Sequence, residues 1–406
     1  MDKYTRINTI RISLLKDKII YTRDLEKRFN VTGRTIRRDL LNLQKSGIAE
    51  LIFGGAKLIE SNNKTLFRDI GIKNIMSKLV EKYPESLNID PRDENSEIGV
   101  YVLGSFNIDI VSEVIDFPKV GQTIHSLSTN FYAGGKGSNQ ATAASIVCDN
   151  VHLAVKIGND SFGLKARDYF AGTNIRSKTI LEDDELPTGN AMIIVSQETG
   201  DNIITIDLAA NQNIHSVELM NEFALIERSK IFLTQLENNF EITRLAIEHA
   251  SRTPATVMVN PAPYQDSIKS IMHLIDIITP NETEAHDLSG IEVIDLESAK
   301  EAALEIYKMG PKIVVITLGA NGSLLFNGNN FQHFKPFKAV VNDTSGAGDS
   351  FNGSLAASLA NGESLEFSLK YASAFASLAV ERKGASNMPD SSLVEARLSM
   401  ESVGAI

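Results

Sequence analysis

The stretch that decides the fold reads Asp343-Thr344-Ser345-Gly346-Ala347-Gly348-Asp349-Ser350-Phe351-Asn352-Gly353. It follows the apolar pair Val340-Val341 and leads into the apolar run Leu355–Leu359. Glycines that come just before a helical pattern predict a tight turn at a helix N-terminus.

This turn carries a chemical signal. Gly346, Ala347 and Gly348 can direct successive backbone N–H groups to one point, which makes an anion hole. Asp349 stands beside the hole, where a carboxylate repels a phosphate but can accept a proton from a hydroxyl that attacks a phosphoryl group. The alternative is an aspartate that only caps its own helix.

A second glycine-rich segment, Ala133-Gly134-Gly135-Lys136-Gly137-Ser138-Asn139-Gln140, precedes a predicted helix of small residues, Ala141 to Ile146. Lys136 and Asn139 at that helix N-terminus could bind hydroxyl groups. A tight turn without a ligand is the other interpretation. Neither segment is a P-loop, because the chain contains no G-x-x-x-x-G-K-[ST] pattern.

Around these segments, short apolar runs alternate with helical patterns from Ile98 onward. Runs such as these predict buried strands of a mostly parallel sheet covered by helices on both faces, an α/β fold. The expected strands include Ile98–Leu103, Thr256–Val259, Ile275–Ile278 and Ile313–Leu318, with a helix at Leu296–Met309.

The first 60 residues predict a separate module. Thr22–Phe29 has a helical stripe, a tight turn follows at Asn30-Val31-Thr32, and Thr32 can cap a second helix that extends to about Gln44. Ile36, Leu40 and Leu43 would be buried, which leaves a basic, hydroxyl-bearing face. Gly47 would end the helix and Ile48–Ile59 would form a hairpin, so the pattern is a winged helix-turn-helix. The residues expected to contact DNA are Arg34, Thr35, Arg37 and Arg38.

Charge agrees with this division. Residues 1–60 carry 13 basic residues (Lys and Arg) and 7 acidic residues (Asp and Glu), a net charge of +6. The other residues carry 27 basic and 44 acidic residues, a net charge of −17. A basic segment on an acidic body is typical of a nucleic-acid-binding module joined to an enzyme. The predicted domains are the module 1–60, a linker 61–97 with one helix at Ile70 to Lys82, and a catalytic domain 98–395.

The composition excludes several classes of protein. The 406 residues hold one cysteine, Cys148, so no internal disulfide forms, and seven scattered histidines offer no zinc-ligand spacing. No apolar run approaches the ~20 residues of a membrane span. We therefore expect a soluble cytoplasmic protein.

The catalytic region resembles the ribokinase (PfkB-type) sugar kinases over almost all of residues 98–395. The resemblance rests on colinear motifs: Gly104-Ser105-Phe106-Asn107-Ile108-Asp109, Gly134–Gln140, Gln235-Leu236-Glu237, Asn260-Pro261-Ala262-Pro263, Thr279-Pro280-Asn281-Glu282-Thr283-Glu284, Thr317-Leu318-Gly319 and Asp343–Gly353. It implies a central sheet with a small β-lid, at about 110–132 and 190–207, and ATP-dependent phosphorylation of a pentose such as D-ribose.

The resemblance also implies roles for single residues. Asp349 would deprotonate the sugar hydroxyl, and the N–H groups of 346–348 would hold the phosphoryl group. The sugar would be bound by Asn107, Asp109, Gly135, Lys136, Asn139, Glu237 and Asp349, and ATP by Asn281, Thr317, Gly319, Gly322 and Gly348. Glu284 would face Mg²⁺ through water, and K⁺ would lie among Asp343, Ser345, Ala379, Arg382 and Gly384.

The first 60 residues resemble the winged helix of DeoR-class sugar-metabolism repressors, chiefly through Thr32-Gly33-Arg34-Thr35-Ile36-Arg37-Arg38-Asp39-Leu40 and Gly54-Gly55-Ala56. This resemblance implies binding to double-stranded DNA. The ribokinase resemblance implies lids that pair to make a homodimer, which would also suit a winged helix on a two-fold operator. Three hypotheses stay open: a ribose kinase that also regulates transcription, a regulator whose kinase-like domain only senses sugar, and a kinase of another pentose such as deoxyribose.

Overall fold

The computed structural model describes residues 19–29, 31–45, 49–58 and 97–403, and the single residues Arg6, Ile10 and Leu14. The chain divides into two compact units, Met1–Leu87 and Asn88–Ile406. The predicted linker lies outside the described residues except for Glu97, and so does its predicted helix. Asn30, Gly47, Ile48 and Ile59 of the predicted turn and hairpin also lie outside them.

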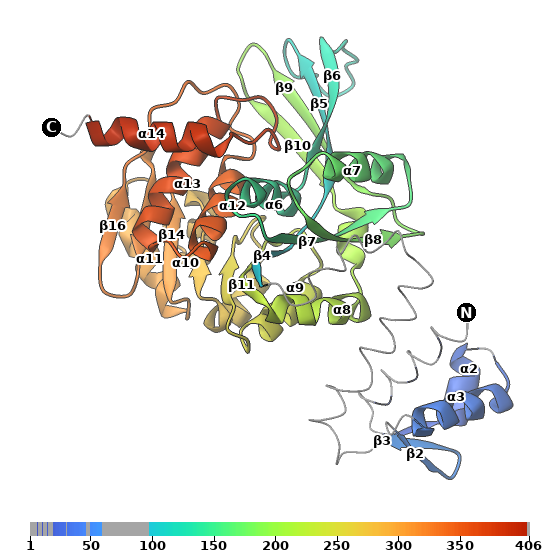
Figure 1. Cartoon of the computed structure of the whole chain (residues 1–406). Helices are drawn as coiled ribbons and strands as arrows, with labels where there is room; N and C mark the ends of the chain where they lie inside the picture. The colour runs from blue at the N-terminus through green and yellow to red at the C-terminus, as the bar shows by residue number, and fades with distance from the viewer. Residues whose placement is uncertain are drawn as a thin grey trace. The chain divides into compact units, whose positions relative to one another are not determined.

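The N-terminal unit is a small helical body with a three-stranded sheet (Figure 1). Its sheet has the antiparallel order β1-β3-β2. The stripe predicted for the second helix is buried, with Ile36, Leu40 and Leu43 at most 3% exposed. The elements are β1 (Ile19–Tyr21), α2 (Thr22–Phe29), α3 (Gly33–Lys45), β2 (Ala49–Ile52) and β3 (Gly55–Leu58).

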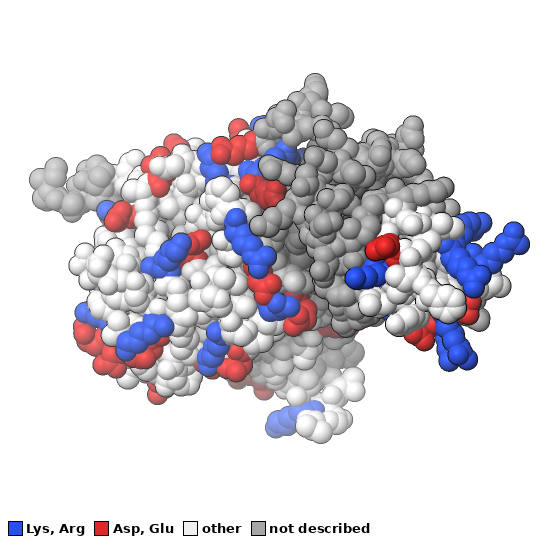
Figure 2. Space-filling view, turned by 90° about the horizontal axis from the view of Figure 1, so that it is seen from below, with Lys and Arg blue, Asp and Glu red and all other residues white. Residues whose placement is uncertain are grey.

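Helix α3 begins as its sequence predicts. Thr32 lies at the N-cap position, where Thr35 N–H donates to Thr32 O at 2.9 Å and, at 3.4 Å, to Thr32 Oγ1. On the other side of the helix, the buried Asp39 carboxylate pairs with Arg6 at 2.7 Å. The exposed face carries Arg34, Arg37 and Arg38, and Figure 2 shows Lys and Arg side chains that stand out from this unit.

The larger unit is built on a mostly parallel sheet, as predicted. Within residues 97–403 its order is β16-β15-β14-β13-β12-β11-β4-β7-β8, and only the two pairings of β15, with β14 and with β16, are antiparallel. The strands are β4 (Ile98–Leu103), β7 (Val151–Gly158), β8 (Ser177–Asp183), β11 (Ser229–Thr234), β12 (Thr256–Val259), β13 (Ile277–Ile278), β14 (Ile313–Thr317), β15 (Ser323–Phe326) and β16 (Phe331–Phe334).

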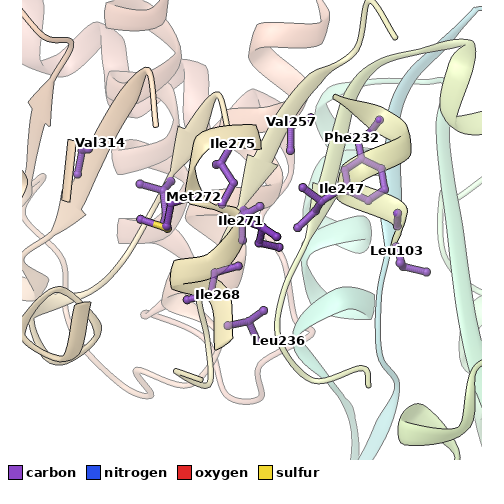
Figure 3. Packing of buried hydrophobic residues seen from close by; sticks show 14 of the residues in the cluster. Leu103, Phe232, Leu236, Ile247, Val257, Ile268, Ile271, Met272, Ile275 and Val314 are labelled. Carbon is purple, nitrogen blue, oxygen red and sulfur yellow. The ribbon is translucent and has the colours of Figure 1, made fainter. Parts of the chain in front are cut away.

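Alternate residues of each strand pack against different helical layers. Val100 and Val102 of β4 join one buried cluster, whereas Tyr101 and Leu103 join the other. Figure 3 shows the packing of the second of these clusters around Phe232 and Val257. One layer is formed by α6 (Lys136–Val147), α7 (Ser161–Ala171), α12 (Ala347–Ala360) and α13 (Leu365–Ala379); the other by α8 (Ser216–Glu227), α9 (Phe240–Ala250), α10 (Glu282–Ser289) and α11 (Leu296–Lys308).

A second, four-stranded sheet has the order β10-β9-β5-β6. Strands β5 and β9 run parallel, and the other neighbours run antiparallel. It contains both segments in which the sequence predicts the lid. The strands are β5 (Asn107–Val114), β6 (Ser128–Gly134), β9 (Gly189–Ser196) and β10 (Asn202–Asp207).

Some predicted bounds were wrong. The strand expected at Ile275–Ile278 is only β13, because the 3-10 helix η4 (Asp266–Leu274) extends almost to its start. The helix expected at Ala141 to Ile146 is α6, which begins five residues earlier at Lys136. The remaining elements are the 3-10 helices η3 (Ala209–Asn213) and η5 (Gly319–Asn321) and helix α14 (Ser391–Val403). None of the helices described in either unit is long and apolar enough to cross a membrane.

Candidate active site

The catalytic candidates lie where the strands of the large sheet end. Helix α12 follows the turn 343–346, and Gly346 caps it with φ 73°, a left-handed conformation that favours glycine. A Cβ atom on Gly346 would also lie 2.5 Å from Ala385 O, so no larger residue fits. This turn places Asp349 in the first turn of α12, where it is 7% exposed.

The predicted anion hole is partly formed by free backbone donors. Ala347 N–H donates to Thr344 O at 3.2 Å, within the turn. The N–H groups of Gly346 and Gly348 have no acceptor in the described residues. Two of the three predicted donors are therefore available to a ligand, at the positive end of the dipole of α12.

Helix α6 holds the carboxylate of Asp349. Asn139 Nδ2 donates to Asp349 Oδ2 at 3.0 Å, and Gln140 Nε2 donates to Asp349 Oδ1 at 3.0 Å. Both donors are neutral amides, so the carboxylate is hydrogen-bonded but not held in an ion pair. The sequence singled out Asn139 but did not reveal the role of Gln140, which is fully buried among small helical residues.

A cleft of about 210 Å³ opens beside Asp349. Eight of the predicted site residues line this cleft, and they come from four separate segments of the chain. They are Lys136, Asn281, Glu284, Thr317, Gly346, Ala347, Gly348 and Asp349. It is also lined by residues that the prediction omitted, namely Asn260, Ala262, Thr279, Thr344 and Asn352. A polar cleft at the carboxyl ends of parallel strands is where α/β proteins bind ligands.

A second acidic group adjoins the start of α6. Glu237 Oε2 accepts Lys136 N–H at 2.9 Å and also the Ser105 hydroxyl. A Cβ on Gly134 would collide with the Asp109 carboxylate, at 2.3 Å, so the glycine leaves room for that group. Asn107 Oδ1 accepts Asn211 Nδ2 at 3.0 Å, a partner that the sequence did not reveal.

The charges of this group are interdependent. Burial raises the pKa of Asp109 to about 7, with help from Glu237 and Asp349, while Lys136 opposes the shift. Burial alone would lower the pKa of Lys136, but Asp349 and Glu237 outweigh it and raise that pKa. Burial also raises the pKa of Glu237 and of Glu284. The ammonium of Lys136 therefore stands among carboxylates.

The residues predicted to face ATP are only partly brought together. Asn281 and Glu284 cap α10 mutually, with Glu284 N–H donating to Asn281 Oδ1 at 2.8 Å and Asn281 N–H to Glu284 Oε2 at 3.0 Å. Thr317 pairs with Asn281 in a parallel bridge. Gly319 begins the adjacent 3-10 helix η5 and Gly322 ends it, and neither lines the cleft.

The loop predicted to hold a monovalent cation is ordered by Asp343. Its carboxylate accepts Ser345 N–H and Gly384 N–H, each at 2.9 Å. Ala379 O already accepts Arg382 N–H at 3.0 Å. In the described part of the chain, no three His, Cys, Asp or Glu side chains form a cluster that could hold a metal ion.

Comparison with known proteins gives the family. A model of the pfkB family of carbohydrate kinases matches residues 98–391. The chain belongs to the pfkB family of carbohydrate kinases. A model of the DeoR-like helix-turn-helix domain matches residues 6–62. Both resemblances seen in the sequence are thereby confirmed, together with the class of enzyme, an ATP-dependent sugar kinase.

Relatives of this pfkB kinase include two pentose kinases. The ribokinase of Haemophilus influenzae is 36% identical over 284 residues, 70% of this chain and 92% of the relative. The deoxyribokinase of Salmonella typhi is 28% identical over 286 residues, 70% and 93% of the two chains. The structure of Arabidopsis thaliana ribokinase with ribose and ATP matches with TM-score 0.67 at 30% identity, covering 75% of this chain and 99% of that one.

Proposed function

We propose that this pfkB kinase transfers the terminal phosphoryl group of ATP to the 5-hydroxyl of D-ribose in the cytoplasm. The observation that carries the proposal is the position of Asp349, beside two free backbone N–H groups and a polar cleft. Ribose is preferred to deoxyribose because the ribokinase relative is the more similar, at 36% against 28% identity.

The reaction needs little covalent help from the protein. The sugar oxygen attacks the terminal phosphorus, its proton passes to a carboxylate oxygen of Asp349, and the bond from that phosphorus to the oxygen of the leaving ADP breaks. The N–H groups of Gly346 and Gly348 stabilise the charge on the transferring group. Lys136, at the same cleft, would help to hold the sugar's hydroxyl groups.

The polar residues around the start of α6 suit a polyol. Asn107, Asp109, Gly135, Asn139 and Glu237 offer both donors and acceptors, which sugar hydroxyls require. Asn139 Oδ1 is buried and has no donor among the described residues, so a sugar hydroxyl can satisfy it. A site built this way discriminates against analogues that lack a hydroxyl.

Magnesium and potassium fit two separate places. Glu284 keeps Oε1 for a water of hydrated Mg²⁺, which would neutralise the phosphate charges of ATP. Asp343 has lone pairs beyond the two that its N–H donors use, so this carboxylate and the carbonyls of 345, 379, 382 and 384 could hold K⁺. Gly319, Gly322, Thr317 and Asn281 would accommodate the nucleotide.

The four-stranded sheet is proposed to close over the sugar and to pair with a second copy. Closure would exclude water, which competes as phosphoryl acceptor. Its edge strand β10 is exposed along its whole length, and Ile204 and Ile206 are 48% and 49% exposed. An exposed apolar edge strand favours pairing. Light scattering should give twice the 44.4 kDa chain mass; a monomer contradicts the pairing.

DNA binding is the second proposed function. It rests on Arg34, Arg37 and Arg38, which are exposed along α3, with Thr35 beside them. Basic side chains on a helix that can enter the major groove would contact phosphates and base edges. The competing hypothesis, a regulator that senses sugar without phosphorylating it, gives no reason for a base beside an anion hole.

The decisive experiment replaces Asp349. Purified protein is assayed with ATP, Mg²⁺ and a panel of pentoses and hexoses, with and without K⁺. Asp349→Ala should lower kcat by about 10²–10⁴-fold, as loss of a general base does, while ATP affinity stays close to the wild-type value. Full turnover by this variant would disprove the role of Asp349, and a wild-type protein inactive on every sugar would favour the sensor.

A further inference from the structure

Beyond Asp349 itself, the site contains a buried chain of amide side chains that no part of the proposed reaction uses. Gln235 Nε2 donates to Gln140 Oε1 at 2.6 Å. Gln140 Nε2 then donates to Asp349 Oδ1 and to Asn260 Oδ1, both at 3.0 Å. Gln140 is 0% and Gln235 2% exposed. Three segments, the start of α6 and the ends of β11 and β12, thus meet at the amide of Gln140, which in turn donates to the carboxylate of Asp349.

The bonds determine which way the amide of Gln140 faces. Its oxygen accepts the N–H of Gln235, and its nitrogen lies between the oxygens of Asn260 and Asp349. Asn260 is itself oriented, because its Nδ2 donates to Thr279 O at 3.1 Å. If the amide of Gln140 were flipped, its oxygen would lie against the acceptor oxygens of Asn260 and Asp349, and its nitrogen would lie against the donor nitrogen of Gln235. The network therefore permits only the observed orientation.

We propose that Gln140, oriented by Gln235, is the positioning residue that keeps Asp349 charged and correctly aimed for proton transfer. This inference rests on the proposed kinase function and adds a residue to it. Gln140 acts through Asp349 rather than on the sugar.

An amide suits this task better than a cation. A buried carboxylate needs donors to stay charged. An Arg or Lys in contact would supply them, but it would stabilise the carboxylate so strongly that it becomes a poor base. Asn139 and Gln140 each donate one neutral N–H to a different oxygen, which leaves a lone pair on each oxygen for the proton of the sugar hydroxyl.

The other charges near Asp349 do not replace this arrangement. They come from Lys136 on α6, Asp109 on β5, Glu237 after β11 and Glu284 on α10. Three of the four are carboxyl groups, which disfavour a further negative charge. Asn139 and Gln140 of α6 therefore supply the hydrogen bonds that hold the Asp349 carboxylate.

The test compares Gln140→Met, Gln140→Glu and wild type, with Ser145→Ala as the control. Ser145 lies on the same helix, is buried, and bonds only Thr142 O, at 2.8 Å. For each protein, kcat is measured across pH at saturating sugar and ATP, and sugar affinity is measured by calorimetry.

Gln140→Met is expected to lower kcat about 100-fold, as misplacement of a catalytic group does, with sugar affinity changed less than about threefold. The acidic limb of its kcat–pH profile should move to higher pH, because the charged carboxylate has one donor fewer. Gln140→Glu should be slower still at pH 7, since it sets a second negative charge against Asp349. Ser145→Ala should keep the wild-type profile.

A structural role for Gln140 gives the opposite order. Glutamate is the closest in shape and still accepts the N–H of Gln235, so it would be tolerated better than methionine, and the acidic limb would not move. Either result overturns the proposal while leaving an active wild-type kinase. An inactive wild type would overturn the kinase function and this inference together. If Gln140→Met does not fold, Gln235→Met takes its place, because Gln235 lies one hydrogen bond further from the carboxylate. The acidic limb of its kcat–pH profile should move in the same direction by a smaller amount. An acidic limb that does not move in Gln235→Met also overturns the proposal.

Discussion

At the residue scale, Asp109 is a carboxyl group whose charge is set by its neighbours. Burial, Glu237 and Asp349 raise its pKa from 3.8 to about 7. The folded protein therefore holds this proton more tightly than the unfolded chain does. Stability from this group is fully present below about pH 4 and is lost as the pH rises toward 7.

Asp109→Asn removes that loss, because an amide does not ionise. The variant should gain stability relative to wild type as the pH rises from 5 to 8. The shift from 3.8 to about 7 sets a ceiling of about 4 kcal/mol. Since Asp109 keeps some contact with water, we expect about 1–2 kcal/mol. Urea unfolding at the two pH values measures the difference.

Asp160→Asn is the matched comparison, because hydrogen bonds lower the pKa of Asp160. Thr188 N–H and Gly163 N–H donate to its carboxylate at 2.9 and 2.7 Å. Its stabilisation is present above the unfolded pKa of about 4 and is lost as the pH falls. Asp160→Asn should therefore lose stability relative to wild type toward neutral pH, and an equal response of both variants would contradict the assignment for Asp109.

At the scale of elements, the contact between α6 and α12 holds the site together. Both helices are lined with small buried residues, so their backbones approach closely. A Cβ atom on Gly353 would lie 2.1 Å from Gln140 O, which is backbone and cannot move without the helix. The same contact contains the hydrogen bonds that the side-chain amides of Asn139 and Gln140 donate to Asp349.

Gly353→Ala should therefore reduce stability and activity together. Overpacking is expected to cost about 1–3 kcal/mol of unfolding free energy, and kcat should fall because α6 no longer meets Asp349 at bonding distance. Gly172→Ala is the control, since its Cβ would meet nothing nearer than 3.5 Å. Thermal melts and kcat at saturation measure both effects. A Gly353→Ala protein as stable as Gly172→Ala would show that the two helices separate without cost.

Local pattern was enough to predict the alternating elements and the turn before Asp349, because strand apolarity and glycine before a helix are properties of neighbouring residues. It was not enough for β13, where η4 ends at Leu274 and only Ile277 and Ile278 of the expected strand 275–278 pair as a strand. Nor could it reveal Gln140, since the partners Asp349 and Gln235 are 209 and 95 positions away in the chain. Such contacts exist only after the sheet has formed.

Backbone bonding explains another partial miss. The sequence assigned three N–H donors to the anion hole, but the N–H of Ala347 is used by Thr344 O within the turn itself. A pattern of small residues indicates that the backbone is accessible; which N–H remains free depends on the turn geometry. The assignments of single residues to ATP, Mg²⁺ and K⁺ stay predictions.

At the scale of the whole molecule, charge separates the two units. Residues 1–60 carry a net of +6 and the remainder −17. The acidic remainder would repel a phosphate backbone, so the proposed association with DNA would come from the basic residues 1–60. Affinity for DNA and its dependence on salt are therefore properties that substitutions on α3 can change without touching the kinase.

The double variant Arg37→Ala/Arg38→Ala tests this separation. Both side chains are exposed on α3, and each phosphate that an arginine no longer neutralises should reduce the slope of log affinity against log salt by about 0.9. We expect weaker binding to duplex DNA, a slope smaller by about 2, and an unchanged kcat for sugar phosphorylation. Arg176→Ala, which removes a 68%-exposed cation from the kinase unit, should alter neither property. Fluorescence anisotropy at several salt concentrations measures the slope.

An intact protein that does not bind DNA, or whose affinity for DNA does not depend on salt, would contradict the proposed DNA binding. The kinase assignment would stay in place, because the two functions depend on different residues.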